Sequence, residues 1–243
     1  MCTRPDHREP QFSAVNLLLL ACLQGSCASQ AGFGRASALP KGTIETFGAA
    51  NVSLATMPTG AEYPVPLPYA DILVGASYGL TERVAVGGRL WGLGIEGLSH
   101  FGVALDSKLE LTPPEPGRRW HAAVAGALGY HQLVVGGTPL HVGSLNVPVL
   151  FGRDFGAHHL AFGPRLTWHV NAGQGQSTIE TTTYGASVGF GWRVARRLEL
   201  FPEAIVGWSP VGFNGQVESP EHQGASFLHL ALGARVVWPP VDR

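Results

Sequence analysis

The stretch AHHLAFGPRLTWHV, residues 157–170, decides the fold because two kinds of side chain alternate along it. Every second residue from His159 to His169 is polar or very small, and every second residue from Leu160 to Val170 is apolar. Side chains of a β-strand point alternately to opposite faces, so this period of two predicts a strand. The two faces of that strand differ so much that we expect them to meet different surroundings.

The composition narrows the class of protein. The chain has 243 residues, of which 45% are hydrophobic, 14% are charged and 33 are glycine. Soluble domains average about 25% charged residues, so a membrane β-barrel fits at least as well as a soluble all-β protein. The sequence holds no apolar run as long as the ~18 residues of a membrane-spanning helix, so strands would do any spanning. A formal net charge of -1 gives no indication of a nucleic-acid partner.

The same alternation recurs in ten segments along the chain. Each is close to or above the ~9–11 residues that a tilted strand needs to cross a bilayer. The pattern therefore predicts an all-β, antiparallel, up-and-down transmembrane barrel of about ten strands. The segments are 42–55, 69–80, 83–94, 100–111, 118–131, 139–152, 158–170, 180–194, 197–212 and 225–238.

The connections between these segments also alternate in length. Residues 81–82, 113–117, 154–157 and 196–197 form short turns, whereas 57–68, 134–139, 171–180 and 214–225 are longer and rich in Gly, Pro and polar residues. The link around residues 95–99 is the exception, because it is short although it lies at the end where the other connections are long. Short turns at one end and long loops at the other are typical of outer-membrane barrels, with the N-terminus on the periplasmic side.

Two details favour a membrane barrel over a soluble sandwich. Aromatic residues lie near the ends of the apolar faces, as in the interfacial girdles of membrane proteins. They are Tyr78, Trp120, Tyr130, Trp168, Trp192, Trp208 and Trp238. A sandwich can also have a polar face, but it would not usually fill that face with Gly and Ala. A small closed barrel would, because its interior is crowded.

The first 41 residues are expected to precede the barrel. Residues 1–28 resemble a secretory signal peptide, with an apolar run from Leu17 to Leu23 followed by small residues. Either a signal peptidase cuts near Cys27, or Cys27 or Cys22 is the lipidated residue of a lipobox. Residues 29–41 would form a linker, 42–238 the barrel and 239–243 a tail. All three cysteines fall within the first 27 residues, so no disulfide framework is expected.

Taken together, these features resemble the small outer-membrane β-barrel proteins of Gram-negative bacteria. The sequence CASQAGFGRASALPKG, residues 27–42, resembles the lead-in of a lipoprotein-like subgroup. Gly233, Val236 and Trp238 match the glycine, apolar and aromatic positions of the terminal assembly signal. Ala231 departs from it, as does the PPVDR that follows the aromatic residue. The resemblance implies an outer-membrane location, with membrane lipid and the barrel-assembly machinery as partners.

The polar face of the strands is expected to line the lumen. We interpret its charges as ion pairs that fill a narrow barrel; the alternative is a polar pore lining for small solutes. The predicted lumen residues are Asp71, Arg89, Asp106, Lys108, Arg119, His159, Arg165, His169, Arg193, Glu203 and Arg235. No cofactor is expected, and no metal site, because ten residues of strand separate His159 from His169 by about 30 Å.

The sequence thus predicts a structural role in the membrane, or the passage of small solutes. One alternative is an outer-membrane enzyme of the protease or lipid-hydrolase type, with an active site at the rim. Its candidate residues would be His131, Ser177, Ser209, Glu218 and His222. The other alternative is a soluble ligand-binding β-barrel.

Overall fold

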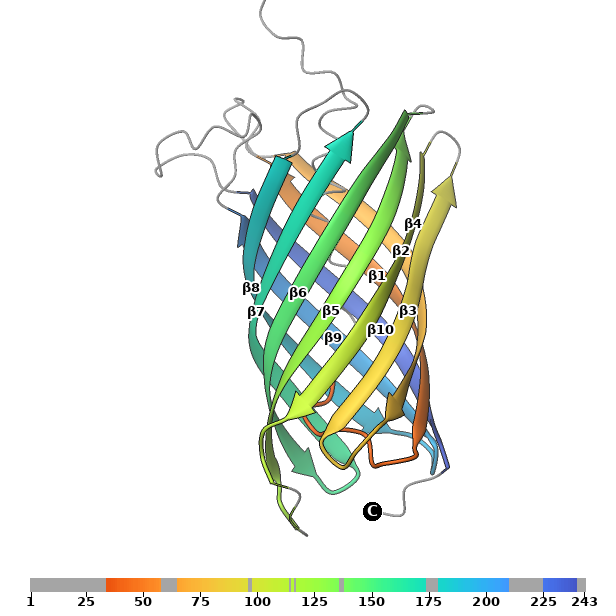
Figure 1. Ribbon diagram of the computed structural model, residues 1–243, viewed down its shortest axis with the longest axis vertical. Coiled ribbons are helices and arrows are strands. Elements are labelled where there is room, and N and C mark those ends of the chain that lie inside the picture. Colours follow the sequence, from red (N-terminus) through yellow and green to blue (C-terminus); the bar gives the residue numbers. More distant parts are fainter. Residues whose placement is uncertain are drawn as a thin grey trace, which may run out of the picture.

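The computed structural model describes residues 34–57, 65–95, 98–113, 115, 117–135, 138–173, 179–209 and 225–239. In these residues ten antiparallel strands follow one another around a closed barrel, and β1 pairs with β10 to complete it (Figure 1). The predicted fold class is therefore confirmed. Over the same ranges, the structure contains no helix with the length and apolar character needed to cross a membrane.

The strands agree with the predicted segments in number and order. They are β1 (Ile44–Met57), β2 (Val65–Gly79), β3 (Val84–Ile95), β4 (Leu98–Glu110), β5 (Trp120–Val135), β6 (Thr138–Phe155), β7 (His158–Gly173), β8 (Ile179–Arg193), β9 (Leu198–Ser209) and β10 (Ala225–Trp238).

Two predicted connections were wrong in length. The supposed long loop at residues 134–139 is mostly strand, because backbone pairing continues until Val135 meets Thr138. The supposed short turn at 113–117 is part of a longer connection between Glu110 and Trp120. Hydropathy locates the middle of a strand, whereas hydrogen bonding between backbones fixes its ends.

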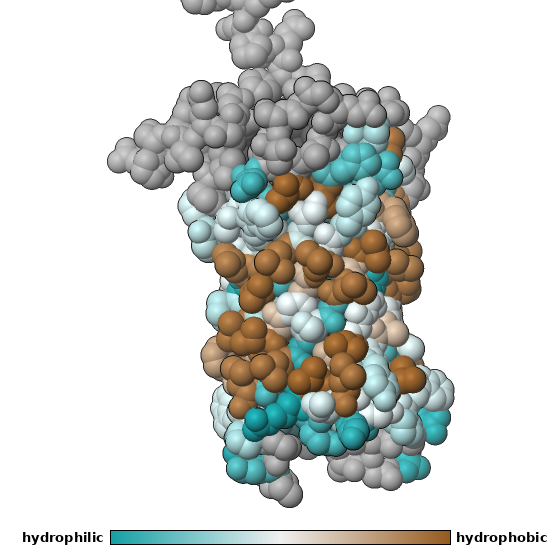
Figure 2. Space-filling model, in the orientation of Figure 1, coloured by the Kyte–Doolittle hydropathy of each residue, from teal (hydrophilic) through white to brown (hydrophobic). Residues whose placement is uncertain are grey.

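The alternation in β7 places its polar face inside the barrel. His159, Arg165 and His169 are only 2–4% exposed. Their apolar neighbours Phe162 and Trp168 are 39% and 41% exposed. The distribution is the reverse of that in a soluble protein, because charges are buried and large apolar side chains cover the outer surface. Figure 2 shows apolar residues around the middle of the visible wall and hydrophilic residues at its lower end.

Exposed aromatic residues lie toward both ends of the outer wall. Those nearer the short turns are Tyr78, Trp120, Trp192 and Trp238, and those nearer the long connections are Tyr130, Trp168, Tyr184 and Trp208. Trp120 and Tyr130 lie on the same strand, β5. Their spacing corresponds to about 33 Å of strand, or about 25 Å along the axis at the usual tilt of ~40°. That height matches the apolar band of an outer-membrane barrel.

Inward glycines make room for large rings in the lumen. A Cβ at Gly102 of β4 would overlap the indole of Trp91 on β3, and a Cβ at Gly233 of β10 would overlap the ring of Phe201 on β9. Each ring therefore packs directly against the backbone of a glycine on the adjacent strand. This packing explains much of the glycine on the inner face of so narrow a barrel.

Candidate functional site

The described residues just before β1 lie inside the barrel at its short-turn end. We call residues 34–40 the inner segment; they belong to the stretch that the sequence suggested was a linker. Ala36, Ser37, Ala38 and Leu39 are only 2–6% exposed. Figure 1 shows this segment, in red and orange, inside the lower mouth of the barrel. The mouth is therefore occupied by the protein's own chain.

Polar groups on three strands hold the inner segment. The Arg35 guanidinium pairs with the Glu199 carboxylate of β9 at 2.6 Å. Lys108 of β4 donates a hydrogen bond to the Arg35 carbonyl at 2.9 Å, and His159 of β7 contacts the Gly34 carbonyl through Nε2 at 2.8 Å. Hydrogen bonds to charged groups contribute about 1.5–3 kcal/mol each, so the segment is anchored from several sides.

Two carboxylates organise the mouth around this segment. Glu110 accepts a hydrogen bond from the Ala38 backbone N–H at 2.8 Å, and its other oxygen lies 2.7 Å from Nδ1 of His121. Glu199 meets Arg35 through one oxygen and Arg235 of β10 through the other, each at 2.6 Å. The inner segment is thus part of the charge network of the mouth.

The middle of the lumen holds two buried ion pairs. Arg89 of β3 lies 2.6 Å from Asp106 on the adjacent strand β4. Arg165 of β7 lies 2.6 Å from Glu203 of β9, and their side chains are 1% and 2% exposed. The second pair reaches across β8, where Gly189 leaves space beside the Glu203 side chain. Each pair neutralises its own charge inside the wall.

Toward the long connections, hydrogen bonds among neutral and acidic groups replace the ion pairs. Asn51 donates to Asp71 at 2.5 Å. The indole N–H of Trp91 donates to His100 at 3.2 Å, and the His131 ring packs edge-on against His100 with centroids 5.2 Å apart. Other contacts at this level join Ser53 to His229 and Thr167 to Asn146. Each of these side chains contacts another inward side chain, so this part of the lumen is packed like a core, although buried atoms such as Asp71 Oδ2, His131 Nδ1 and His229 Nε2 lack a hydrogen-bond partner among the described residues.

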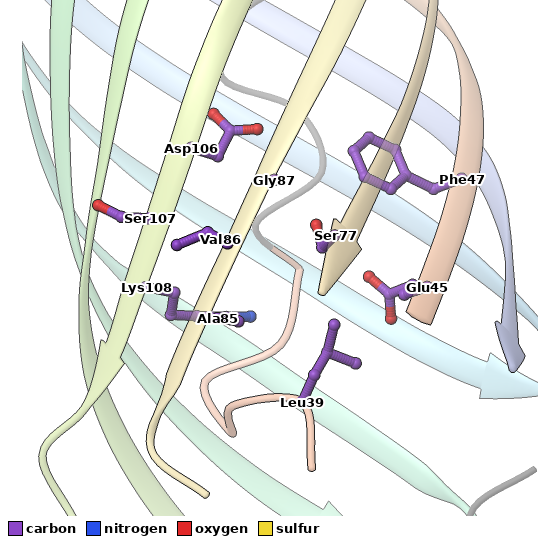
Figure 3. A pocket seen from close by; sticks show the side chains of 10 residues that line it. All are labelled: Leu39, Glu45, Phe47, Ser77, Ala85, Val86, Gly87, Asp106, Ser107 and Lys108. Atoms are coloured by element: carbon purple, nitrogen blue, oxygen red, sulfur yellow. The ribbon is translucent and has the colours of Figure 1, made fainter. Parts of the chain in front are cut away.

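A small cavity lies in the lumen at the short-turn end. Figure 3 shows a cavity beside the inner segment, where Leu39 lies near Glu45 of β1 and Lys108 of β4. Its volume is about 30 Å³, enough for about one water molecule. A water-filled channel would expose the side chains that line it, yet Asn146 and His229 are 1% and 0% exposed. Over the described residues, the lumen is filled.

The structure places most of the predicted lumen residues inside the barrel. Those that point inward are Asp71, Arg89, Asp106, Lys108, His159, Arg165, His169, Glu203 and Arg235. Arg193 is half-buried at the mouth. Arg119 is exposed, so its prediction was wrong: β5 begins only at Trp120, and the alternation does not reach the residue before it.

The remaining predicted residues are the two candidate cysteines for lipid attachment and the rim residues of the enzyme alternative. Cys22 and Cys27 lie outside the described residues, as do Ser177, Glu218 and His222. His131 is buried against Trp91, and the Ser209 hydroxyl donates to the Thr182 carbonyl at 3.3 Å. Among the described residues, no three His, Cys, Asp or Glu side chains form a group that could hold a metal ion.

Sequence reasoning missed the inner segment. Its only sequence signal is a run of small residues, from Gly34 to Ala38, interrupted by one arginine. Small side chains fit a narrow lumen, and the single cation meets Glu199 there. Such a run is equally common in exposed linkers, so the pattern alone does not separate the two environments.

These features define a closed ten-stranded barrel with an apolar wall and a filled polar lumen. The chain matches no protein-family model and no curated protein. Among solved structures it is similar to the outer membrane protease OmpT from Escherichia coli, with 9% identity over 82% of this chain and 97% of that one, and a TM-score of 0.44.

Two further similar structures are also outer-membrane barrels. The translocator domain of the autotransporter NalP from Neisseria meningitidis has 11% identity over 92% of this chain and 97% of that one, with a TM-score of 0.46. An outer membrane channel from Pseudomonas putida F1 has 13% identity over 85% and 99%, with a TM-score of 0.47. The roles of these neighbours differ, and at such identities the likeness concerns the fold alone.

Proposed function

We propose that the protein is an outer-membrane β-barrel of a Gram-negative bacterium, with a sealed lumen and a structural role in the membrane. The observation that carries the location is the outer wall. Leu105 is 70% exposed and Leu128 is 65% exposed, between two sets of aromatic residues. In water such a continuous apolar surface would drive aggregation, whereas in a bilayer it meets acyl chains.

The same wall argues against a soluble ligand-binding barrel. A soluble barrel directs apolar side chains toward its ligand cavity and polar ones toward water. Here the distribution is inverted, with Arg165 and Glu203 buried inside and leucines outside. The proposed partners are therefore the membrane lipid around the wall and the assembly machinery that would recognise β10.

The sealed lumen supports the structural role over solute passage. The inner segment closes the mouth, and the pairs Arg89–Asp106 and Arg165–Glu203 fill the middle. Passage of small solutes would require the inner segment to leave and these pairs to separate. The proposal assigns the barrel no enzymatic activity.

Planar-bilayer conductance tests the sealed lumen. The wild-type protein is expected to insert without a steady conductance. Arg35→Glu places a carboxylate beside Glu199 and is expected to give intermittent openings as the inner segment is repelled. Arg118→Glu is the matched control, because Arg118 is a partly exposed residue outside the lumen that pairs with nearby Glu115. A steady, ohmic conductance from the wild-type protein would contradict the proposal.

A further inference from the structure

A cluster of arginines surrounds a second pocket at the short-turn end. The pocket lies between the inner segment and the adjoining ends of β8, β9 and β10. Four arginines and one acidic residue are among the described residues that line it: Arg35, Arg193, Arg196, Arg197 and Glu199. We call it the arginine pocket. A lining rich in arginine attracts negatively charged ligands.

Glu199 is shared between two arginines at this end of the barrel. Glu199 is engaged by Arg35 and also by Arg235, a fifth cation that lies deeper in the mouth. Arg235 also lies 3.6 Å from the Glu45 carboxylate, so Glu199 and Glu45 together match the charges of Arg35 and Arg235. The positive charges of Arg193 and Arg197 add to the field in the pocket.

The pocket adjoins the outer wall where the aromatic residues lie. The Arg197 guanidinium sits 4.9 Å from the ring centre of Trp238, which faces outward. Trp192 and Val194, at the end of β8 and just after it, are also exposed apolar residues. A ligand with a charged head and an apolar body could place its head among the arginines and its body against these three side chains.

We propose that the arginine pocket binds the phosphate group of an anionic phospholipid from the periplasmic leaflet. Guanidinium groups form charge-assisted, often bidentate, hydrogen bonds with phosphate oxygens. Clustered basic side chains at a membrane surface recognise anionic head groups by this chemistry. The proposal rests on the membrane location proposed above, and on the short turns facing the periplasm.

Native mass spectrometry of the full chain in neutral detergent tests the site. The protein is mixed with equal amounts of phosphatidylglycerol and phosphatidylcholine, and retained lipid is counted. The wild type is expected to retain phosphatidylglycerol at least tenfold better. The double variant Arg193→Gln, Arg197→Gln is expected to lose that preference. The control is Arg83→Gln, Arg119→Gln, which removes the same charge from exposed positions at the same end of the barrel.

Each outcome decides the proposal. Loss of preference in the double variant, with the preference kept in the control, supports the site. Equal loss in both would mean general electrostatic attraction and overturns it. A separate titration with inorganic phosphate, which needs no membrane, identifies the source of the ligand: if the wild type binds free phosphate but shows no lipid preference, the lipid assignment fails while the membrane location stands. A heat-dependent gel shift verifies that each variant is folded.

Discussion

Removing Arg165 should destabilise the barrel more than removing any exposed arginine. Arg165 is the cation of the most deeply buried ion pair described above, 2.6 Å from Glu203. In Arg165→Ala, the Glu203 carboxylate would keep its place in the wall and lose this guanidinium. Inside a filled lumen, water cannot replace the lost partner without disturbing the packing.

The size of the effect follows from burial. Breaking a buried ion pair by removing one partner costs about 3–5 kcal/mol, because it leaves an uncompensated charge. The exposed Arg118–Glu115 pair is the reference, with side chains 27% and 61% exposed. Exposed pairs contribute about 0–1 kcal/mol. Arg165→Ala should therefore lower the free energy of unfolding by about 3 kcal/mol more than Arg118→Ala does.

The measurement is denaturant unfolding of the folded protein in lipid vesicles, followed by tryptophan fluorescence. The double variant Arg165→Met, Glu203→Leu is a second comparison, because replacing both charges with apolar groups also removes the carboxylate that would have lost the Arg165 guanidinium. We expect it to recover most of the stability that Arg165→Ala loses. If Arg165→Ala costs no more than Arg118→Ala, then Glu203 is not a buried partner and the filled lumen is wrong.

Three further changes probe the wall, the packing and the N-terminus. Leu105→Arg, midway along β4, should cost about 2–4 kcal/mol in vesicles, whereas Leu109→Arg near the end of the same face should cost about 0–1 kcal/mol; equal costs would argue against a bilayer around the wall. Gly102→Ala should cost about 1–3 kcal/mol by forcing a ring to move, while Gly126→Ala, which meets only an ordinary contact, should stay within about 0.5 kcal/mol. If Cys27 is the lipidated residue, labelled fatty acid should enter the protein and be lost in Cys27→Ser; no labelling would leave an ordinary cleaved signal.

The fold was predictable because a membrane wall imposes a simple rule on every strand. In β7 the rule shows directly, since each residue from His159 to His169 that faces the lumen is polar or small. A closed barrel repeats that rule in every strand, so ten weak signals add to one strong prediction. Arg119 shows the limit of the rule, because alternation is meaningful only where the backbone is paired as strand.

The sequence alone does not predict which charged residues pair with one another inside the lumen. Arg165 had several acidic residues available in principle, among them Asp71, Asp106 and Glu203. Its partner depends on how far each strand is shifted along its neighbour, since Arg165 faces Gly185 of β8 and meets the Glu203 carboxylate one strand further, on β9. That shift is a property of the whole closed sheet. No local stretch of sequence encodes it.

The inner segment and the carboxylates at the short-turn end stabilise each other. Glu110 and Glu199 face inward at the short-turn end, where burial would be costly for carboxylates without donors. The inner segment brings the Ala38 backbone N–H to one and the Arg35 guanidinium to the other. In return, those carboxylates hold a stretch of small residues that has too little apolar surface to fold by itself. The inner segment therefore adds a donor to each carboxylate beyond His121 and Arg235 of the wall, and the segment has a defined place because the closed barrel brings both carboxylates together.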